Sequence, residues 1–368
     1  MTADYSLIYM YFILVVIVNK SITCSMTGLC KLTSNKGNIN CFKNIHKLYL
    51  GNTTFTLKAI FQMNKYLHKF TSLSVQHRLD LFEKLITPIL NYGSQVWGFA
   101  QGTCIERVHL QFCKRLLGVK KCTQNDFVYG ELGRLNCQYV RYFIIIKYWV
   151  KILHANDNKY VKKVYNMLKY DFESNPDKKN WCSLLYDLLC TLGFNDAWLF
   201  QDIGDSVLFL SLVKQRLKDQ FIQNWNGRLE ESSRAIFYKH ISSFDFKPYL
   251  NILNISKFRY SMTKLRVSSH RLSIESGRWS KPNPTPLSER NCLFCNLLED
   301  EYHFVLECNL YNTLRKLYIP KYYRTRPNML KMYELINAGN SKVLKNLSIF
   351  INKAFELRNS TIYADNRN

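Results

Sequence analysis

Four candidate metal ligands fall within residues 292 to 308, a stretch too short to fold around a hydrophobic core of its own. The segment reads CLFCNLLEDEYHFVLEC, a C-x2-C-x7-H-x4-C spacing. Its first two cysteines can form a tight turn, and the histidine and last cysteine can reach the same centre. Three thiolates and an imidazole suit tetrahedral zinc and leave no position for a catalytic water. The pattern predicts a structural Zn²⁺ site, without which the segment would lose its fold, with the ligands Cys292, Cys295, His303 and Cys308.

A chance grouping of reduced thiols is the alternative for this segment. The other nine cysteines are scattered without a repeating spacing, several of them inside apolar helical patterns, which favours a reducing compartment. The acidic residues of the segment are weaker zinc donors than thiolate and imidazole, so we expect them to be solvated surface groups. These residues are Glu299, Asp300, Glu301 and Glu307.

The composition indicates a folded and strongly basic chain. Of 368 residues, 47% are hydrophobic and 14% aromatic, with only 14 Gly and 8 Pro, which excludes a disordered or collagen-like protein. The length allows two or three domains. Lys and Arg number 51 against 27 Asp and Glu, a net charge of +24, so the surface attracts polyanions: nucleic acid first, a membrane surface second.

Helical periodicity runs through most of the chain. Apolar residues recur every three or four positions in five stretches, with Pro88 near the end of the first and Gly118 as a stop signal after the second. We therefore expect a mainly α fold, a helical multi-domain body followed by a small CCHC zinc-binding module. The predicted helices span residues 75–91, 105–117, 137–153, 184–189 and 213–225.

Basic and aromatic residues interleave on both sides of the zinc segment. A spacer with three prolines, residues 281–286, separates residues 257–279 from the zinc segment, and a second basic stretch follows it. Lys and Arg can neutralise phosphates while aromatic rings stack on unpaired bases. A solvated charged face is the alternative. The predicted nucleic-acid contacts are Lys257, Arg259, Lys264, Arg266, His270, Arg271, Arg278, Trp279, Arg315, Lys316, Lys321, Arg324 and Arg326.

The N-terminus adds a different possibility. Residues 5–18 form an uncharged run of fourteen residues, shorter than the roughly 20 apolar residues that a membrane-spanning helix needs. Such a run is typical of a buried segment or the core of a signal peptide. We expect a nuclear or cytoplasmic protein without a membrane partner, and keep a membrane-associated or secreted protein as the alternative.

Several segments, in order, resemble a known family. They are LDLFEKLITPILNYGSQVWGF (79–99), IERVHLQFCKRLLGVKK (105–121), VYGELGRLN (128–136) and LRVSSHRLSIESGRW (265–279), followed by the CCHC segment. Together they look like the part that follows the polymerase palm in reverse transcriptases of non-LTR (LINE-type, Jockey-like) retrotransposons. That resemblance implies thumb and connection regions, then a zinc-binding region, which hold RNA and DNA beside a catalytic half.

The resemblance also suggests a division of the chain into consecutive segments. The expected segments are an apolar leader (1–54), a thumb/connection-like region (55–175), a second helical region with the basic stretch (176–280), the zinc-binding module (281–335) and a C-terminal helix and tail (336–368).

The polymerase active site of this family is missing from the chain. A reverse transcriptase needs paired aspartates to hold two Mg²⁺ ions, and no Asp-Asp pair occurs in the sequence. The eight histidines are dispersed, and no nucleophile elbow or Gly-rich phosphate loop is present. We therefore expect no catalytic residues and no enzymatic activity. The sequence predicts a zinc-stabilised, nucleic-acid-binding remnant of such a reverse transcriptase, with a zinc-stabilised protein-interaction scaffold as another alternative.

Overall fold

The computed structural model describes residues 57–61, 63, 65, 73–100 and 102–365, and the apolar run at 5–18 lies outside them. The described chain is mainly helical, as predicted, and β pairing in these residues is limited to two isolated bridges. The chain forms two compact units that interleave along the sequence. Among the described residues, unit 1 comprises 57–61, 63, 65, 81–100, 102–109 and 135–223, and unit 2 comprises 73–80, 110–134 and 224–365.

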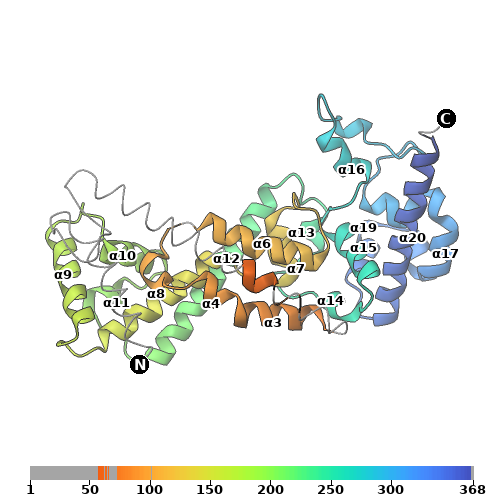
Figure 1. The fold of residues 1–368 in the computed structure, drawn as a ribbon. Coiled ribbons are helices and arrows are strands. Elements are labelled where there is room, and N and C mark those ends of the chain that lie inside the picture. Colours follow the sequence, from red (N-terminus) through yellow and green to blue (C-terminus); the bar gives the residue numbers. More distant parts are fainter. Residues whose placement is uncertain (1–56, 62, 64, 66–72, 101, 366–368) are drawn as a thin grey trace. The chain divides into compact units, whose positions relative to one another are not determined.

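Unit 1 packs its helices around buried aromatic side chains. Trp149, which is fully buried, donates its indole N–H to the Tyr165 hydroxyl at 3.0 Å. Asn136 caps the start of the helix predicted over 137–153 by accepting a hydrogen bond from the Tyr139 amide at 3.2 Å. The helices of unit 1 are α4 (Thr87–Leu90), α5 (Ser94–Trp97), α8 (Cys137–Leu153), α9 (Tyr160–Ser174), α10 (Trp181–Thr191) and α11 (Asn195–Phe200), with parts of α3 (Val75–Leu85), α6 (Thr103–Leu117) and α12 (Ser206–Glu231). Helices α8 to α11 of this unit are labelled in Figure 1.

The first predicted helix is interrupted. The sequence suggested one helix over 75–91, whereas α3 ends at Leu85 and α4 begins at Thr87. Pro88 explains the interruption, because it has no amide N–H to continue the helical hydrogen bonds. The other four predicted helices correspond to α6, α8, α10 and α12.

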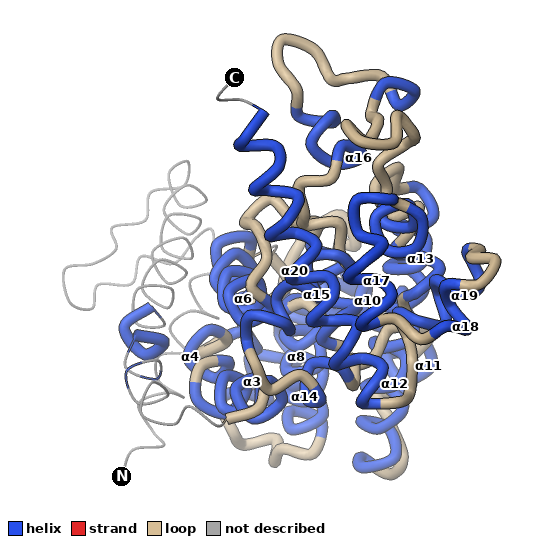
Figure 2. The backbone as a smooth tube through the Cα atoms, turned by 90° about the vertical axis from the view of Figure 1, so that its right-hand side faces the viewer, coloured by secondary structure: helices blue, strands red, loops and turns tan. Residues whose placement is uncertain are grey.

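Unit 2 is arranged around its longest described helix, α20 (Ser341–Asp365). Helices α15, α17 and α19 pack against α20 (Figures 1 and 2). The remaining helices and turns of unit 2 are α7 (Asn125–Leu132), α13 (Tyr238–Ile241), α14 (Tyr249–Ile252), α15 (Ser256–Arg266), α16 (Ser273–Ser276), η1 (Gly277–Trp279), η2 (Leu287–Glu289), η3 (His303–Glu307), η4 (Asn309–Tyr311), α17 (Asn312–Tyr318), α18 (Lys321–Arg324) and α19 (Met329–Ile336).

A buried ion pair joins α7 to α15 inside unit 2. The guanidinium of Arg266 contacts both carboxylate oxygens of Glu131 at 3.0 to 3.2 Å, and neither side chain is more than 1% exposed. Tyr249 donates its hydroxyl to the same carboxylate at 2.7 Å. The pair is therefore fully desolvated, and each charge depends on the other.

The segment with the four candidate ligands also belongs to unit 2. Phe304 stacks on Phe355 of α20 with ring centroids 4.7 Å apart and meets Phe350 of the same helix at 6.4 Å. The proline-rich residues 281–286 form a mostly exposed loop. No helix within the described residues is long and apolar enough to cross a membrane.

Candidate metal centre

The first two candidate ligands lie on a small hairpin. Asn291 and Leu298 form an isolated antiparallel bridge, and the amide of Cys292 donates to the carbonyl of Leu297 at 2.7 Å. Asn296 turns the chain with φ of 51°, in the left-handed region that asparagine tolerates better than most residues. The turn leaves the thiols of Cys292 and Cys295 on the side of Cys308, at 3.8 and 3.7 Å from its sulfur.

Of the other two ligands, His303 is the first residue of the single π-helical turn η3 and Cys308 directly follows it. The amide of Cys308 donates to the carbonyl of His303 at 2.8 Å, which is the i to i+5 hydrogen bond of a π turn. Asp300 caps the start of this turn by accepting from the His303 amide at 2.7 Å. The wide turn therefore brings His303 and Cys308 to one centre.

All four predicted ligands are brought together. Their ligand atoms lie within 4.8 Å of one another, so this group could hold a metal ion. The sulfur–sulfur distances of 3.7 and 3.8 Å are too long for a disulfide, whose bond is about 2.05 Å. They match the separation of about 3.8 Å that tetrahedral Zn–S bonds of about 2.3 Å would give.

The imidazole of His303 provides an independent test of the fit. His303 is 3% exposed, and both of its ring nitrogens lack a hydrogen-bond partner. Its Nδ1 comes no closer than 3.7 Å to the Glu307 carboxylate. A buried polar group without a partner is costly, and a metal ion bound to one ring nitrogen would remove that cost. The donor set and this histidine both fit a bound ion.

A buried guanidinium lies beside the sulfur cluster. Arg315, which is 3% exposed, donates to the carbonyl of Val305 at 2.8 Å and to that of Cys308 at 2.9 Å. Burial raises the pKa of the Cys308 thiol to about 12. A divalent ion bound by three thiolates carries one net negative charge, which the Arg315 guanidinium would balance.

The acidic residues of the segment correct one expectation. Glu299 and Glu301, expected to be solvated, are only 4% and 5% exposed. Arg358 of α20 donates to both oxygens of Glu299 at 2.6 Å, and His270 lies 2.9 Å from Glu301. Burial opposes ionisation of Glu299, but Arg358 holds the pKa of its carboxyl below the ordinary value. Through these contacts, Glu299 and Glu301 hold residues 292–308, the metal segment, in place within unit 2. Asp300 is partly buried at the π turn, and Glu307 is exposed.

Three of the predicted nucleic-acid contacts have internal roles. Arg266 is bound to Glu131, His270 to Glu301, and Arg315 to carbonyls of the metal segment. Each side chain is buried, so none of the three offers its charge to a phosphate in this structure.

The other predicted contacts are at least partly exposed. Lys257 is exposed and forms an ion pair with Glu356 at 2.9 Å. Arg324 donates to the carbonyl of Ile319 at 2.9 Å. The exposed members also include Arg271, Trp279, Lys316, Lys321 and Arg326, and the partly buried members are Arg259, Lys264, Arg278 and Arg324.

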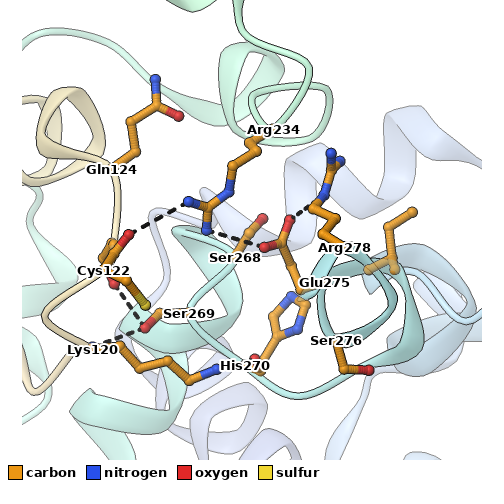
Figure 3. A network of polar contacts seen from close by, with 12 residues as sticks. Lys120, Cys122, Gln124, Arg234, Ser268, Ser269, His270, Glu275, Ser276 and Arg278 are labelled. Atoms are coloured by element: carbon orange, nitrogen blue, oxygen red, sulfur yellow. Dashed lines mark hydrogen bonds and ion pairs between the residues drawn. The ribbon is translucent and has the colours of Figure 1, made fainter. Parts of the chain in front are cut away.

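A basic cluster surrounds Glu275 (Figure 3), and it joins two predicted contacts, Arg271 and Arg278, to basic residues that were not among the predicted contacts. Arg234 and Arg278 each donate to one oxygen of the Glu275 carboxylate at 3.0 Å. Lys120 reaches the carbonyl of His270 at 2.7 Å. We define the basic cluster as Lys114, Lys120, Arg234, Arg271 and Arg278.

Positive charges crowd one another in the basic cluster. Burial lowers the pKa of Lys114 and of Lys120, and the charge of Arg234 lowers both further. The guanidinium of Arg234 also lies 5.6 Å from the ring centroid of Trp279, which is 63% exposed. The members come from three distant stretches of the sequence, so a local pattern could reveal Arg271 and Arg278 but not their grouping with Lys114, Lys120 and Arg234.

Comparisons with protein-family models, with curated proteins and with solved structures find no match for this chain.

Proposed function

We propose that this protein is a zinc-stabilised nucleic-acid-binding protein that holds RNA or DNA by its phosphates. The observation that carries the proposal is the basic cluster. Five cationic side chains gather there, and the carboxylate of Glu275 contacts two of them. A phosphodiester backbone would relieve the crowding of positive charge and release its own counterions.

The exposed ring of Trp279 adds a second type of contact to the basic cluster. A flat aromatic surface beside cations suits an unpaired base, which can stack while its phosphate meets an arginine. In this proposal the metal is Zn²⁺, the ion that a donor set of three thiolates and one imidazole favours. Zinc would hold the segment against α20 and so keep the loop containing His270 and Arg271 in place.

The proposed origin of the chain rests on sequence resemblance alone. It is the C-terminal part of a LINE-type reverse transcriptase, without the paired aspartates of the polymerase site and hence without polymerase activity. A separate reverse-transcriptase catalytic half as partner, and a nuclear or cytoplasmic location, belong to the same proposal.

The experiment is a salt-titrated fluorescence anisotropy assay on single-stranded RNA and on duplex DNA. The test variant is Lys120→Gln with Arg271→Gln, and the matched control is Lys214→Gln with Lys218→Gln on α12, whose side chains are also exposed. We expect the slope of log affinity against log salt to fall by about 2 in the test variant relative to the control. Binding that is absent or insensitive to salt, or an equal loss in both variants, would contradict the proposal.

Exposed apolar side chains on the metal hairpin favour a second candidate function, a protein-interaction scaffold. Leu293 is 69% exposed, Phe294 45% and Leu297 55%. Exposed apolar side chains that lie together on one short hairpin are typical of a surface that contacts another protein. If this is the function, a partner pull-down should survive nuclease treatment and be lost in Leu293→Ser with Phe294→Ser, which leave the ligands intact.

A further inference from the structure

A second group of metal-binding side chains lies in unit 1, away from the CCHC segment in sequence. Ligand atoms of Glu106, His109 and Cys137 lie within 4.8 Å of one another. Nδ1 of His109 is 3.1 Å from Oε1 of Glu106, and His109 also hydrogen-bonds the thiol of Cys137. The three donors are a carboxylate, an imidazole and a thiol, and each of these groups binds Zn²⁺ in proteins.

Two helices fix this geometry. Glu106 and His109 are three residues apart on α6, so their side chains share a helical face. Cys137 is the first residue of α8, and its amide donates to Oε2 of Glu106 at 2.7 Å. The carboxylate is held by α8 through one oxygen and meets His109 through the other. The donors are positioned before any ion binds.

We propose that Glu106, His109 and Cys137 form a second zinc site, a three-ligand centre with one coordination position open to water. Tetrahedral bonds of about 2.0 to 2.1 Å to nitrogen and oxygen would separate those two atoms by about 3.3 Å, close to the 3.1 Å between His109 and Glu106. A thiolate, a carboxylate and a neutral imidazole together carry two negative charges. They neutralise a divalent cation, so the complex can be buried without an unpaired charge.

The burial of the three ligands is consistent with a metal site that has one position open to water. Cys137 is 3% exposed and His109 9%, whereas the side chain of Glu106 is 21% exposed and gives the ion contact with solvent. Binding would form a metal–sulfur bond and release the thiol proton to water, with no change in oxidation state. The three protein ligands and open position distinguish the site from the closed CCHC centre.

Metal stoichiometry of the purified full-length chain tests the proposal. After a mild chelator wash and zinc reloading, elemental analysis should find two zinc ions per chain in the wild type and one in Cys137→Ser. Cys182→Ser is the matched control, because Cys182 is a fully buried thiol of unit 1 outside both groups, and it should keep two ions. Glu106→Gln keeps an oxygen for the Cys137 amide but loses the charge, and we expect it to weaken the second site at least tenfold.

Cobalt substitution provides a readout that does not depend on the CCHC centre. The difference spectrum between wild type and Cys137→Ser should show tetrahedral cobalt with charge transfer from a single thiolate. A metal content that is the same in the wild type, Cys137→Ser and His109→Gln would overturn the proposal, and the Glu106 carboxylate would then serve only as a hydrogen-bond acceptor for the Cys137 amide. Neither outcome bears on nucleic-acid binding, which the salt titration tests separately.

Discussion

The Arg266 side chain illustrates how one buried charge can be structural in a chain with an excess of cations. Its guanidinium contacts Glu131, the carbonyl of Ile336 and the side chain of Asn337. The excess of Lys and Arg therefore includes cations that stabilise unit 2 from inside. Arg315 and Arg358 act in the same way, at the metal segment and at Glu299.

Removing Arg266 should destabilise unit 2 strongly. Arg266→Ala leaves the Glu131 carboxylate buried without its partner, a change that costs about 3–5 kcal/mol. Arg271→Ala, at an exposed position five residues later, should change the free energy of unfolding by less than about 0.5 kcal/mol. Urea denaturation at neutral pH compares the two variants. Equal stabilities would show that the buried pair is not a structural element.

We expect protonation of the Glu299 carboxyl to cause part of the loss of folding stability at acidic pH. Its pKa lies below the ordinary 4.5, because Arg358 and Ser273 hold the ionised form despite burial. The stability from this pairing is present above pH 4.5 and is lost as the pH falls through the lower folded value. Glu299→Gln should therefore flatten the fall in stability below pH 4.5 when the metal-loaded wild type and variant are compared by urea denaturation. An unchanged slope would argue against the pairing.

At the scale of helices, the predicted and observed helices agree because helical periodicity can be read directly from the sequence. Cys137–Leu153 forms as predicted, because its apolar residues recur at a helical spacing and Asn136 caps it. The CCHC ligands meet because their spacing is local. The burial of Glu299 and Glu301 and the place of Arg234 in the basic cluster escaped prediction, since the residues they contact, Arg358, His270 and Glu275, are more than thirty positions away. Sequence spacing carries no information on such contacts.

The end of α6 gives a prediction at this scale. Gly118 has φ of +67°, and a Cβ there would lie 2.3 Å from the ring of Tyr260. Gly204 shares a positive φ of +60° but faces open space. Both alanine variants carry the backbone cost of about 1 kcal/mol, and Gly118→Ala should lose at least a further 1 kcal/mol through the clash. Thermal unfolding compares the two variants. Similar losses of stability would show that the Tyr260 ring does not lie against Gly118.

At the scale of the whole molecule, two units with separate cores would make the loss of an ion from the CCHC group a local event. The core of unit 1 contains Trp149, Trp181 and Trp198, whereas the CCHC centre packs on α20 in unit 2. A segment that cannot bury a core of its own would depend on the proposed ion, and the free energy of metal binding would then contribute to folding. Stability in the two units should therefore respond differently to loss of the CCHC ion.

Hydrogen exchange followed by mass spectrometry tests this separation. In Cys308→Ser, amides over residues 291–308 should lose protection by at least tenfold, and α20 should follow because Phe304 stacks on it. Amides of α8 and α10 should keep their wild-type rates, since their core is built around Trp149 and Trp181. Leu293→Ser, on the same hairpin but outside the ligand set, is the control and should leave both regions protected. Uniform loss of protection across both units would mean that the chain unfolds as one cooperative body, with the metal stabilising all of it.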